Sequence, residues 1–149
     1  MRSLLLPLLL FCPLCWARVP EQSSVPAISV NPEAVEFAQQ LIKDSRVVPD
    51  RKGNWRRDQP STKRNNDFIH AHGLEEYGKW HLGIDRRHRI GSKAQYKFSF
   101  GDFQNLHRCG LLAVKARAHE FGYVEIESAA TQLLELIESI KPIRQKRVD

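Results

Sequence analysis

Trp80–Asp85 reads WHLGID and Tyr96–Phe100 reads YKFSF, and these two stretches decide the fold. In both segments apolar or aromatic residues occupy every second position and small or polar residues occupy the positions between them. This period-2 alternation predicts two half-buried β-strands. The basic segment 86–93 lies between them and is expected to form the loop of a β-hairpin.

Two helices are predicted after this hairpin. Asp102 is placed to cap the first helix, expected over residues 103–121, and Gly122 is placed to stop it. Apolar residues cover most of that helix, so we expect it to be central and buried. The second helix, about 125–140, has Leu, Ile and Ala on one face and Glu on the other, and Pro142 is expected to end it.

The region before the hairpin holds one more clear helix. Asn31-Pro32-Glu33 is a typical helix start, and apolar residues recur at helical spacing over residues 32–44. Residues 45–66 are polar, basic and interrupted by Gly and Pro, which predicts a long loop. Residues 66–72 are expected to add one or two helical turns, closed by Gly73.

The predicted fold class is therefore α+β, a small antiparallel β-hairpin packed with three to four α-helices in a single domain. This domain is expected over residues 31–141. An extended N-terminal arm over residues 18–30 precedes it, and a basic C-terminal tail over residues 142–149 follows it.

Residues 1–17 predict a signal peptide. A charged start, Met1-Arg2, is followed by an apolar run of roughly 13 residues, which is shorter than the ~20 needed to span a bilayer. Ala17 is the expected cleavage position. The predicted localisation is secreted or extracellular, without a membrane span after cleavage; an uncleaved anchor is the alternative.

Three cysteines are present, and two of them, Cys12 and Cys15, lie in the predicted leader. Cys109 alone remains after cleavage, so no intrachain disulfide is expected in the mature chain. Cys109 lies in an apolar helical run, and we expect a buried, inert thiol. Pairing between two chains is the alternative for an odd cysteine in a secreted protein.

Three blocks of the chain, Gly78–Asp85, Tyr96–Gly110 and Ala118–Tyr123, resemble a family of small proteins with bacterial and animal members. The resemblance covers roughly residues 32–138 and implies a shared α+β unit. It implies no activity, cofactor or site residue, because none is assigned to that family. The leader and the basic loops lie outside the matching blocks.

The strongest local signal is positive charge: the chain has 23 Lys and Arg against 17 Asp and Glu, a net charge of +6. Residues 85–90 read DRRHRI and fit the pattern X-B-B-X-B-X, in which B is a basic residue, which resembles heparin-binding segments. The hypothesis is a secreted binding module that contacts a glycosaminoglycan or an acidic protein surface, with nucleic acid disfavoured for a secreted protein. The alternative is that this basic segment is a solvent-exposed polar loop without a binding role. The candidate polyanion-binding residues are Arg86, Arg87, Arg89 and Lys93, extended by Arg56 and Arg57.

A second hypothesis is a small secreted enzyme or ligand carrier. It uses a pocket near Trp80, His81, His107 and Arg117, because His107 and Arg117 point to the apolar side of the predicted central helix. A catalytic pair of His107 and Cys109 is not supported, since the two diverge by about 200° on one helix. No catalytic residue is predicted, and a non-enzymatic role is favoured.

The remaining histidines give a weak metal signal. His70 and His72, spaced by two, and the nearby His81 are candidate ligands, but no further ligand can be placed from sequence. No metal site and no cofactor are therefore predicted. The chain also lacks a phosphate-binding loop, a Gly-x-Ser-x-Gly motif, a calcium loop and an Asn-x-Ser/Thr acceptor.

A processed peptide precursor is the third hypothesis. Residues 144–147 read RQKR, which matches a furin-type cleavage sequence, and dibasic pairs occur at Lys63-Arg64 and Arg86-Arg87. Cleavage after residue 147 removes only two residues, and the closing helices are expected to form a core. We therefore interpret the motif as incidental.

Overall fold

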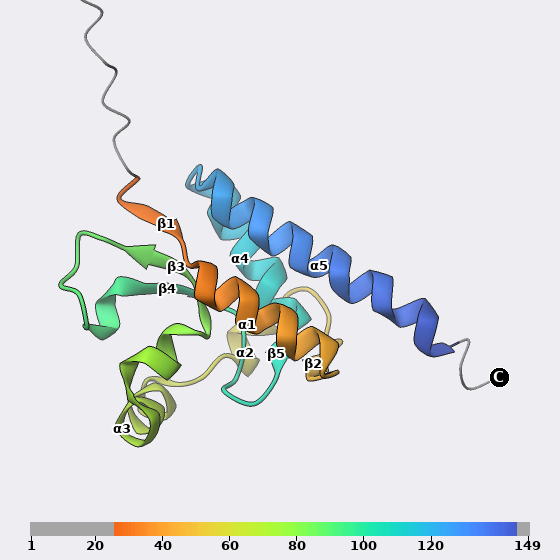
Figure 1. The fold of residues 1–149 in the computed structure, drawn as a ribbon, viewed down its shortest axis with the longest axis horizontal. Coiled ribbons are helices and arrows are strands. Elements are labelled where there is room, and N and C mark those ends of the chain that lie inside the picture. The colour runs from red at the N-terminus through yellow and green to blue at the C-terminus, as the bar shows by residue number, and fades with distance from the viewer. Residues whose placement is uncertain (1–25, 146–149) are drawn as a thin grey trace, which may run out of the picture.

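The computed structural model describes the backbone of residues 26–145 and the side chains of residues 26–140. The expected signal peptide, most of the expected arm and the last four residues of the tail lie outside the described residues. Within this described part the protein is a single α+β domain, as predicted (Figure 1). None of the described helices has the length and apolarity to cross a bilayer.

A three-stranded antiparallel sheet forms one part of the core, in the order β1-β3-β4. The predicted hairpin is confirmed as β3 (His81–Asp85) and β4 (Tyr96–Ser99), joined by a loop and a 3-10 turn, η1 (Lys93–Gln95). The end of the expected arm is itself a strand, β1 (Ile28–Val30), which pairs with β3. The central strand β3 therefore has a neighbour on both sides.

Three helices pack against this sheet: α1 (Pro32–Lys43), α4 (Arg108–Glu120) and α5 (Val124–Gln145). Helix α5 is longer than expected, because it continues beyond Pro142 to Gln145. Helix α5 packs against both α4 and α1, and Figure 1 shows α1 running beside α5. Gly122 ends α4 with a positive φ of 70°, as its position predicted. Fully buried side chains at the centre are Leu41, Leu82, Phe100, Leu111 and Leu133.

The prediction of a helix from residue 103 was wrong. Residues 102–105 form a turn in which Asp102 accepts hydrogen bonds from the backbone amides of Gln104 and Asn105. A short strand, β5 (Leu106–His107), follows and pairs in parallel with β2 (Val47–Val48). Strand pairing thus replaces the first turn of the expected helix, and α4 begins only at residue 108.

The predicted loop over residues 45–66 was also wrong in extent. Besides β2 it contains a single helical turn, α2 (Trp55–Asp58), and the start of α3 (Thr62–Gly78). The hydroxyl of Ser61 caps α3 by accepting a hydrogen bond from the backbone amide of Arg64. Gly73 has a non-helical φ of 85° and closes the first helical part of α3, as predicted, and a second helical part continues to Gly78.

Candidate metal centre

Four side chains from distant segments meet where β5 joins α4. Asp50 follows β2, Asp58 ends α2, His107 ends β5, and Cys109 lies in the first turn of α4. One potential ligand atom from each of them lies within 4.8 Å of those of the other three. In the part of the chain that the structure describes, these four are the one group of three or more His, Cys, Asp and Glu side chains that can hold a metal ion in this way.

Asp50 is the centre of the cluster. Its Oδ1 accepts a hydrogen bond of 2.6 Å from the backbone amide of Cys109. Its Oδ2 lies 2.9 Å from Sγ of Cys109 and 2.7 Å from Nδ1 of His107. The carboxylate therefore caps the positive N-terminal end of α4 and holds both neighbouring side chains.

These contacts set the protonation of Asp50 and Cys109. Burial raises the pKa of Asp50, but the hydrogen bonds from Cys109 and His107 outweigh it and hold that pKa below its ordinary value. Burial, together with the Asp50 carboxylate, raises the pKa of the Cys109 thiol to about 12. At neutral pH the thiol is protonated and donates to the carboxylate. Cys109 is only 1% exposed, so it is not a free nucleophile in this state.

The His107 ring is buried between two carboxylates. While Nδ1 faces Asp50, Nε2 lies 3.5 Å from Oδ2 of Asp102, a close approach without the alignment of a hydrogen bond. The indole of Trp55 packs against the ring, with a centroid distance of 5.7 Å. The imidazole is therefore fixed in place, and one of its nitrogens is buried without a hydrogen-bond partner.

Asp58 is the most accessible of the four. Its carboxylate forms an ion pair with Arg57, with Nε of Arg57 2.8 Å from Oδ1, and its side chain is 21% exposed. The Arg57 side chain itself extends into solvent. Asp58 thus closes the solvent side of the cluster, while the other three ligands lie deeper.

The sequence interpretation missed this site for an identifiable reason. It placed His107 and Cys109 on one continuous helix, where their side chains diverge. Because His107 belongs to β5 and only Cys109 belongs to α4, both side chains point toward Asp50. The His-x-Cys spacing was the available signal, but Asp50 and Asp58 come from a segment that was predicted to be a loop.

The predicted pocket residues do not converge. Trp80 packs with Phe37 and Phe100 in the core. His81 is buried and contacts the carbonyl of Tyr77 through Nδ1. Arg117 was expected on the buried side of its helix, but its side chain is exposed, because it pairs with Glu120 and lies over the ring of Phe121. Of the four proposed residues, only His107 belongs to the candidate metal centre.

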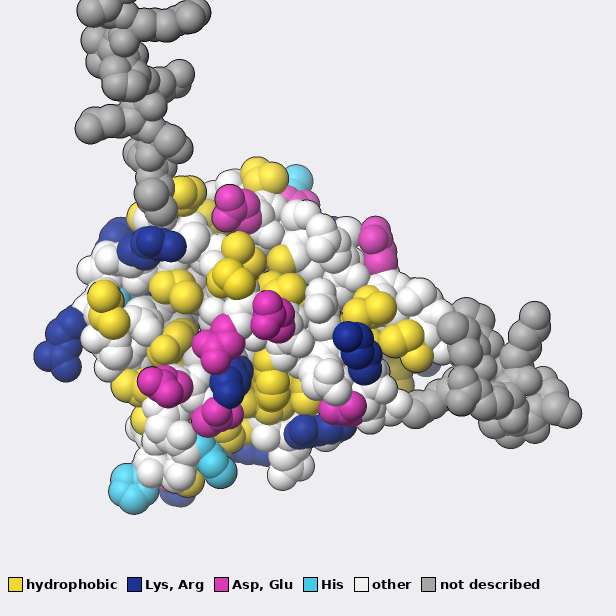
Figure 2. Space-filling view, in the orientation of Figure 1, with side chains coloured by type: hydrophobic (Ala, Val, Ile, Leu, Met, Phe, Trp, Pro, Cys, Tyr) yellow, Lys and Arg dark blue, Asp and Glu magenta, His cyan; other side chains and the backbone are white. Residues whose placement is uncertain are grey.

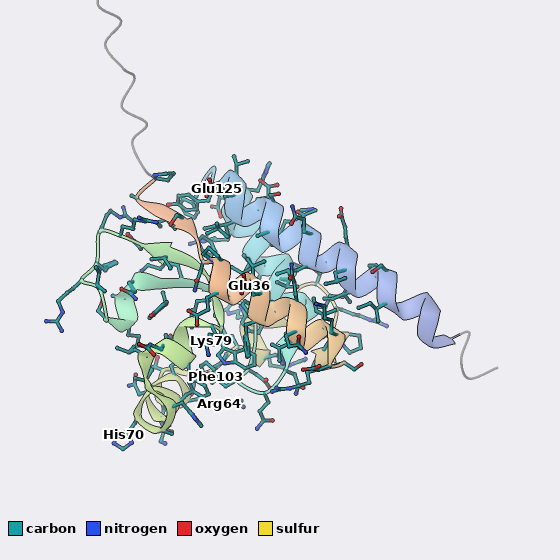
Figure 3. All side chains as sticks on the ribbon, in the orientation of Figure 1. Glu36, Arg64, His70, Lys79, Phe103 and Glu125 are labelled. Atoms are coloured by element: carbon teal, nitrogen blue, oxygen red, sulfur yellow. The ribbon has the colours of Figure 1, made fainter. Side chains whose placement is uncertain are left out.

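The other predicted histidine ligands are also separate. His70 and His72 lie exposed on α3, and Figure 3 shows His70 pointing away from the body of the protein. His81 is enclosed by Tyr77 and Tyr96. Burial lowers the pKa of His81 to about 4, so it is neutral at physiological pH and held as part of the core.

The candidate polyanion-binding residues fall into two groups. In the hairpin loop, both oxygens of buried Asp85 accept hydrogen bonds from Arg87, which hold the pKa of that carboxyl well below its usual range. Lys93 donates to Asn66 of α3. Figure 2 shows Lys and Arg side chains at the outer edge of this loop. Figure 1 places α2, which carries Arg56 and Arg57, well apart from it.

Comparisons with known proteins add no relative. No protein-family model, curated protein or solved structure matches the chain. The resemblance of the Gly78–Asp85, Tyr96–Gly110 and Ala118–Tyr123 blocks to a family of small proteins stays a prediction. The function must therefore be argued from the geometry of the chain itself.

Proposed function

We propose that the protein binds a transition-metal ion of the zinc class through Asp50, Asp58, His107 and Cys109. One observation carries the proposal: the ligand atoms of four residues of three ligand types, spread over 60 positions of the chain, lie within 4.8 Å of one another. Burying polar groups costs free energy, and a metal ion that all four groups coordinate would offset this cost.

The donor set points to zinc. A thiolate and an imidazole are ligands of Zn²⁺ and its neighbours, whereas Mg²⁺ and Ca²⁺ prefer oxygen ligands alone. With zinc–ligand bonds of roughly 2.0–2.3 Å, neighbouring ligands of a tetrahedral ion lie about 3.5 Å apart. The cluster reaches this geometry if the short contacts of Asp50 open slightly and Asp58 moves inward. Four protein ligands make a closed, structural centre.

Metal binding requires the thiolate, so the proton of Cys109 must leave. Because the thiol pKa is about 12 without metal, one proton is released from it for each ion bound at any pH below that value. The ion would also offset the negative charge of the Asp50 and Asp58 carboxylates, which lie within 4.8 Å of each other. It then ties the segment of Asp50 and Asp58 to the start of α4.

The test is titration with Co²⁺ and Zn²⁺ of the full chain in a Cys12→Ser/Cys15→Ser background, which leaves Cys109 as the one thiol. We expect one Co²⁺ per chain, with a thiolate-to-cobalt charge-transfer band and the visible bands of tetrahedral cobalt. Zn²⁺ should displace it. Between pH 7.5 and 9 the Zn²⁺ dissociation constant should fall about tenfold per pH unit.

Matched variants locate the site. Cys109→Ser should abolish the charge-transfer band and weaken Zn²⁺ binding by more than about 100-fold. His70→Ala and Asp67→Asn, which alter an exposed histidine and an exposed carboxylate of α3, should change neither. The proposal is wrong if cobalt gives no thiolate band, or if Cys109→Ser binds zinc as the parent does; the cluster is then only a hydrogen-bond network.

A second candidate function is contact of the hairpin loop with anionic partners outside the cell. The specific observation is that Arg86, Arg87 and Arg89 are exposed on a loop that the Asp85–Arg87 pair holds in shape, with the exposed Ile90, 90% accessible, directly after Arg89. A guanidinium can bind a sulfate or phosphate group through two parallel hydrogen bonds, so these exposed arginines suit an anionic partner. This proposal rests on the expected secretion of the chain, which stays a prediction.

A further inference from the structure

We propose that a cavity between β4, α2 and the α4–α5 turn is a binding site for a small organic carboxylate with a flat apolar body. The cavity has a volume of about 460 Å³. This is within the usual range of small-molecule sites. It is separate from the four metal-ligand side chains, and the inference does not depend on metal binding.

Aromatic side chains form its walls: Trp55, Phe98, Phe121 and Tyr123. The Tyr123 ring bridges two of them, with centroid distances of 5.8 Å to Phe98 and 6.1 Å to Phe121. Phe121 is 53% exposed, a large apolar side chain left in contact with water. An occupant with an apolar face would remove this surface from water.

The Phe98 ring is already fixed in its position in the cavity wall before a ligand binds. Phe98 has a φ of 64° inside a strand, a conformation that costs free energy for a residue with a side chain. Its ring lies over Gly83 of the neighbouring strand, where a Cβ atom would come within 2.7 Å of Phe98 Cδ2. The absence of a side chain at Gly83 therefore admits the ring that shapes the cavity.

The charge of the lining selects an anion. Among the described residues, Lys97 and Arg117 are the charged residues of the lining, and no Asp or Glu belongs to it. Lys97 forms no ion pair with any described residue. Arg117 pairs with Glu120 at 3.2 Å, but both side chains are more than 60% exposed, so water weakens that pair. Both cations are therefore available to form ion pairs with the carboxylate of a ligand.

The aromatic walls and the two cations together favour a carboxylate that carries an aromatic ring. A guanidinium binds a carboxylate through two parallel hydrogen bonds, and the aromatic rings stack on a flat body. The Arg117 guanidinium already lies 4.8 Å from the centroid of the Phe121 ring, which places its charge beside the apolar wall. A peptide or a second protein copy would need a larger apolar face than this cavity offers.

The experiment is isothermal titration calorimetry of the full chain with three probes of one shape: 4-phenylbutyrate, 4-phenylbutanamide and 4-phenylbutylammonium. We expect the carboxylate to bind with one site, at least tenfold more tightly than the amide, and the ammonium not to bind. Lys97→Gln/Arg117→Gln should remove the preference for the carboxylate. Lys115→Gln, on the same helix but outside the cavity, should keep it.

Two further variants test the apolar walls. Ala113→Phe fills the cavity and should abolish binding, and Phe121→Ala, at an exposed position that tolerates truncation, should weaken it at least fivefold. The carboxylate should bind equally well with and without a metal chelator. The proposal is overturned if none of the probes binds, if Phe121→Ala has no effect, or if the chelator abolishes binding, because the carboxylate would then be bound by a metal ion.

Discussion

Sγ of Cys109 lies 2.9 Å from Oδ2 of Asp50, a residue 59 positions earlier in the chain. The same carboxylate also accepts a hydrogen bond from the backbone amide of Cys109. These two contacts fix the positions of both side chains. In the absence of metal the pair keeps the thiol protonated and the carboxylate charged. With the thiol protonated, the pair forms a hydrogen bond that stabilises the fold. With the thiol deprotonated, both groups are suited to bind a metal ion.

Asp50→Asn should destabilise the metal-free protein. The amide keeps the shape of the carboxylate but loses the charge that faces the amide and thiol of Cys109, so we expect a loss of about 1–3 kcal/mol in the free energy of unfolding. The pKa of Cys109 should fall, because Asp50 is one of the causes that raise it. Urea denaturation and ultraviolet titration of the thiolate measure the two effects. An unchanged thiol pKa would contradict this account.

His81 should make stability fall with acid. Burial lowers its pKa from 6.5 to about 4, so the folded state resists protonation that the unfolded chain accepts. The stabilisation is complete above pH 6.5 and is lost as the pH falls toward 4. A difference of roughly 2.5 pH units, at about 1.4 kcal/mol each, corresponds to roughly 3–4 kcal/mol.

His81→Asn tests this directly, because the asparagine amide can still donate to the carbonyl of Tyr77 but does not titrate. In denaturation series between pH 7 and 4.5, the variant should lose much less stability than the parent. His70→Ala, which removes an exposed histidine, should follow the parent curve. Parallel curves for the parent and His81→Asn would show that His81 is not the group responsible.

The hairpin loop should give salt-sensitive retention on heparin if it contacts anionic partners. Arg86→Ala/Arg89→Ala should lower the salt concentration of elution clearly, since each arginine there can reach a sulfate. Arg87→Ala should have a smaller effect on elution, because Asp85 already holds that guanidinium. Lys43→Ala/Lys63→Ala removes the same charge from other exposed positions and serves as the control. Equal elution of the two double variants would exclude a specific role of the loop.

Gly110 should tolerate no side chain. A Cβ atom there would lie 2.7 Å from the carbonyl oxygen of Phe100, and a backbone group cannot turn aside as a side chain can. Gly110→Ala should therefore lower the free energy of unfolding by about 1–3 kcal/mol, although alanine favours helix. Ala116→Ser, at an exposed position of the same helix, should cost less than about 1 kcal/mol. Thermal unfolding of the two variants provides the comparison.

The predictable part of this fold was local. The alternation of Trp80, Leu82 and Ile84 and the apolar periodicity of residues 125–140 depend only on neighbours in the chain, and both elements were found. The β2–β5 pairing was not predictable, because it joins two-residue strands whose hydrogen bonds form only in the folded chain. The same pairing decides where α4 begins. Without it, the position of His107 relative to Cys109 could not be predicted either.

The single turn α2 carries one wall of the proposed carboxylate-binding cavity at Trp55 and, three residues later, a proposed metal ligand at Asp58. One helical turn has no stability of its own, so its shape depends on the rest of the domain. A single proteolytic nick between residues 51 and 57, where the segment is mostly exposed, would disable both sites in one event. Grafting residues 49–61 alone onto another scaffold would, conversely, transfer neither.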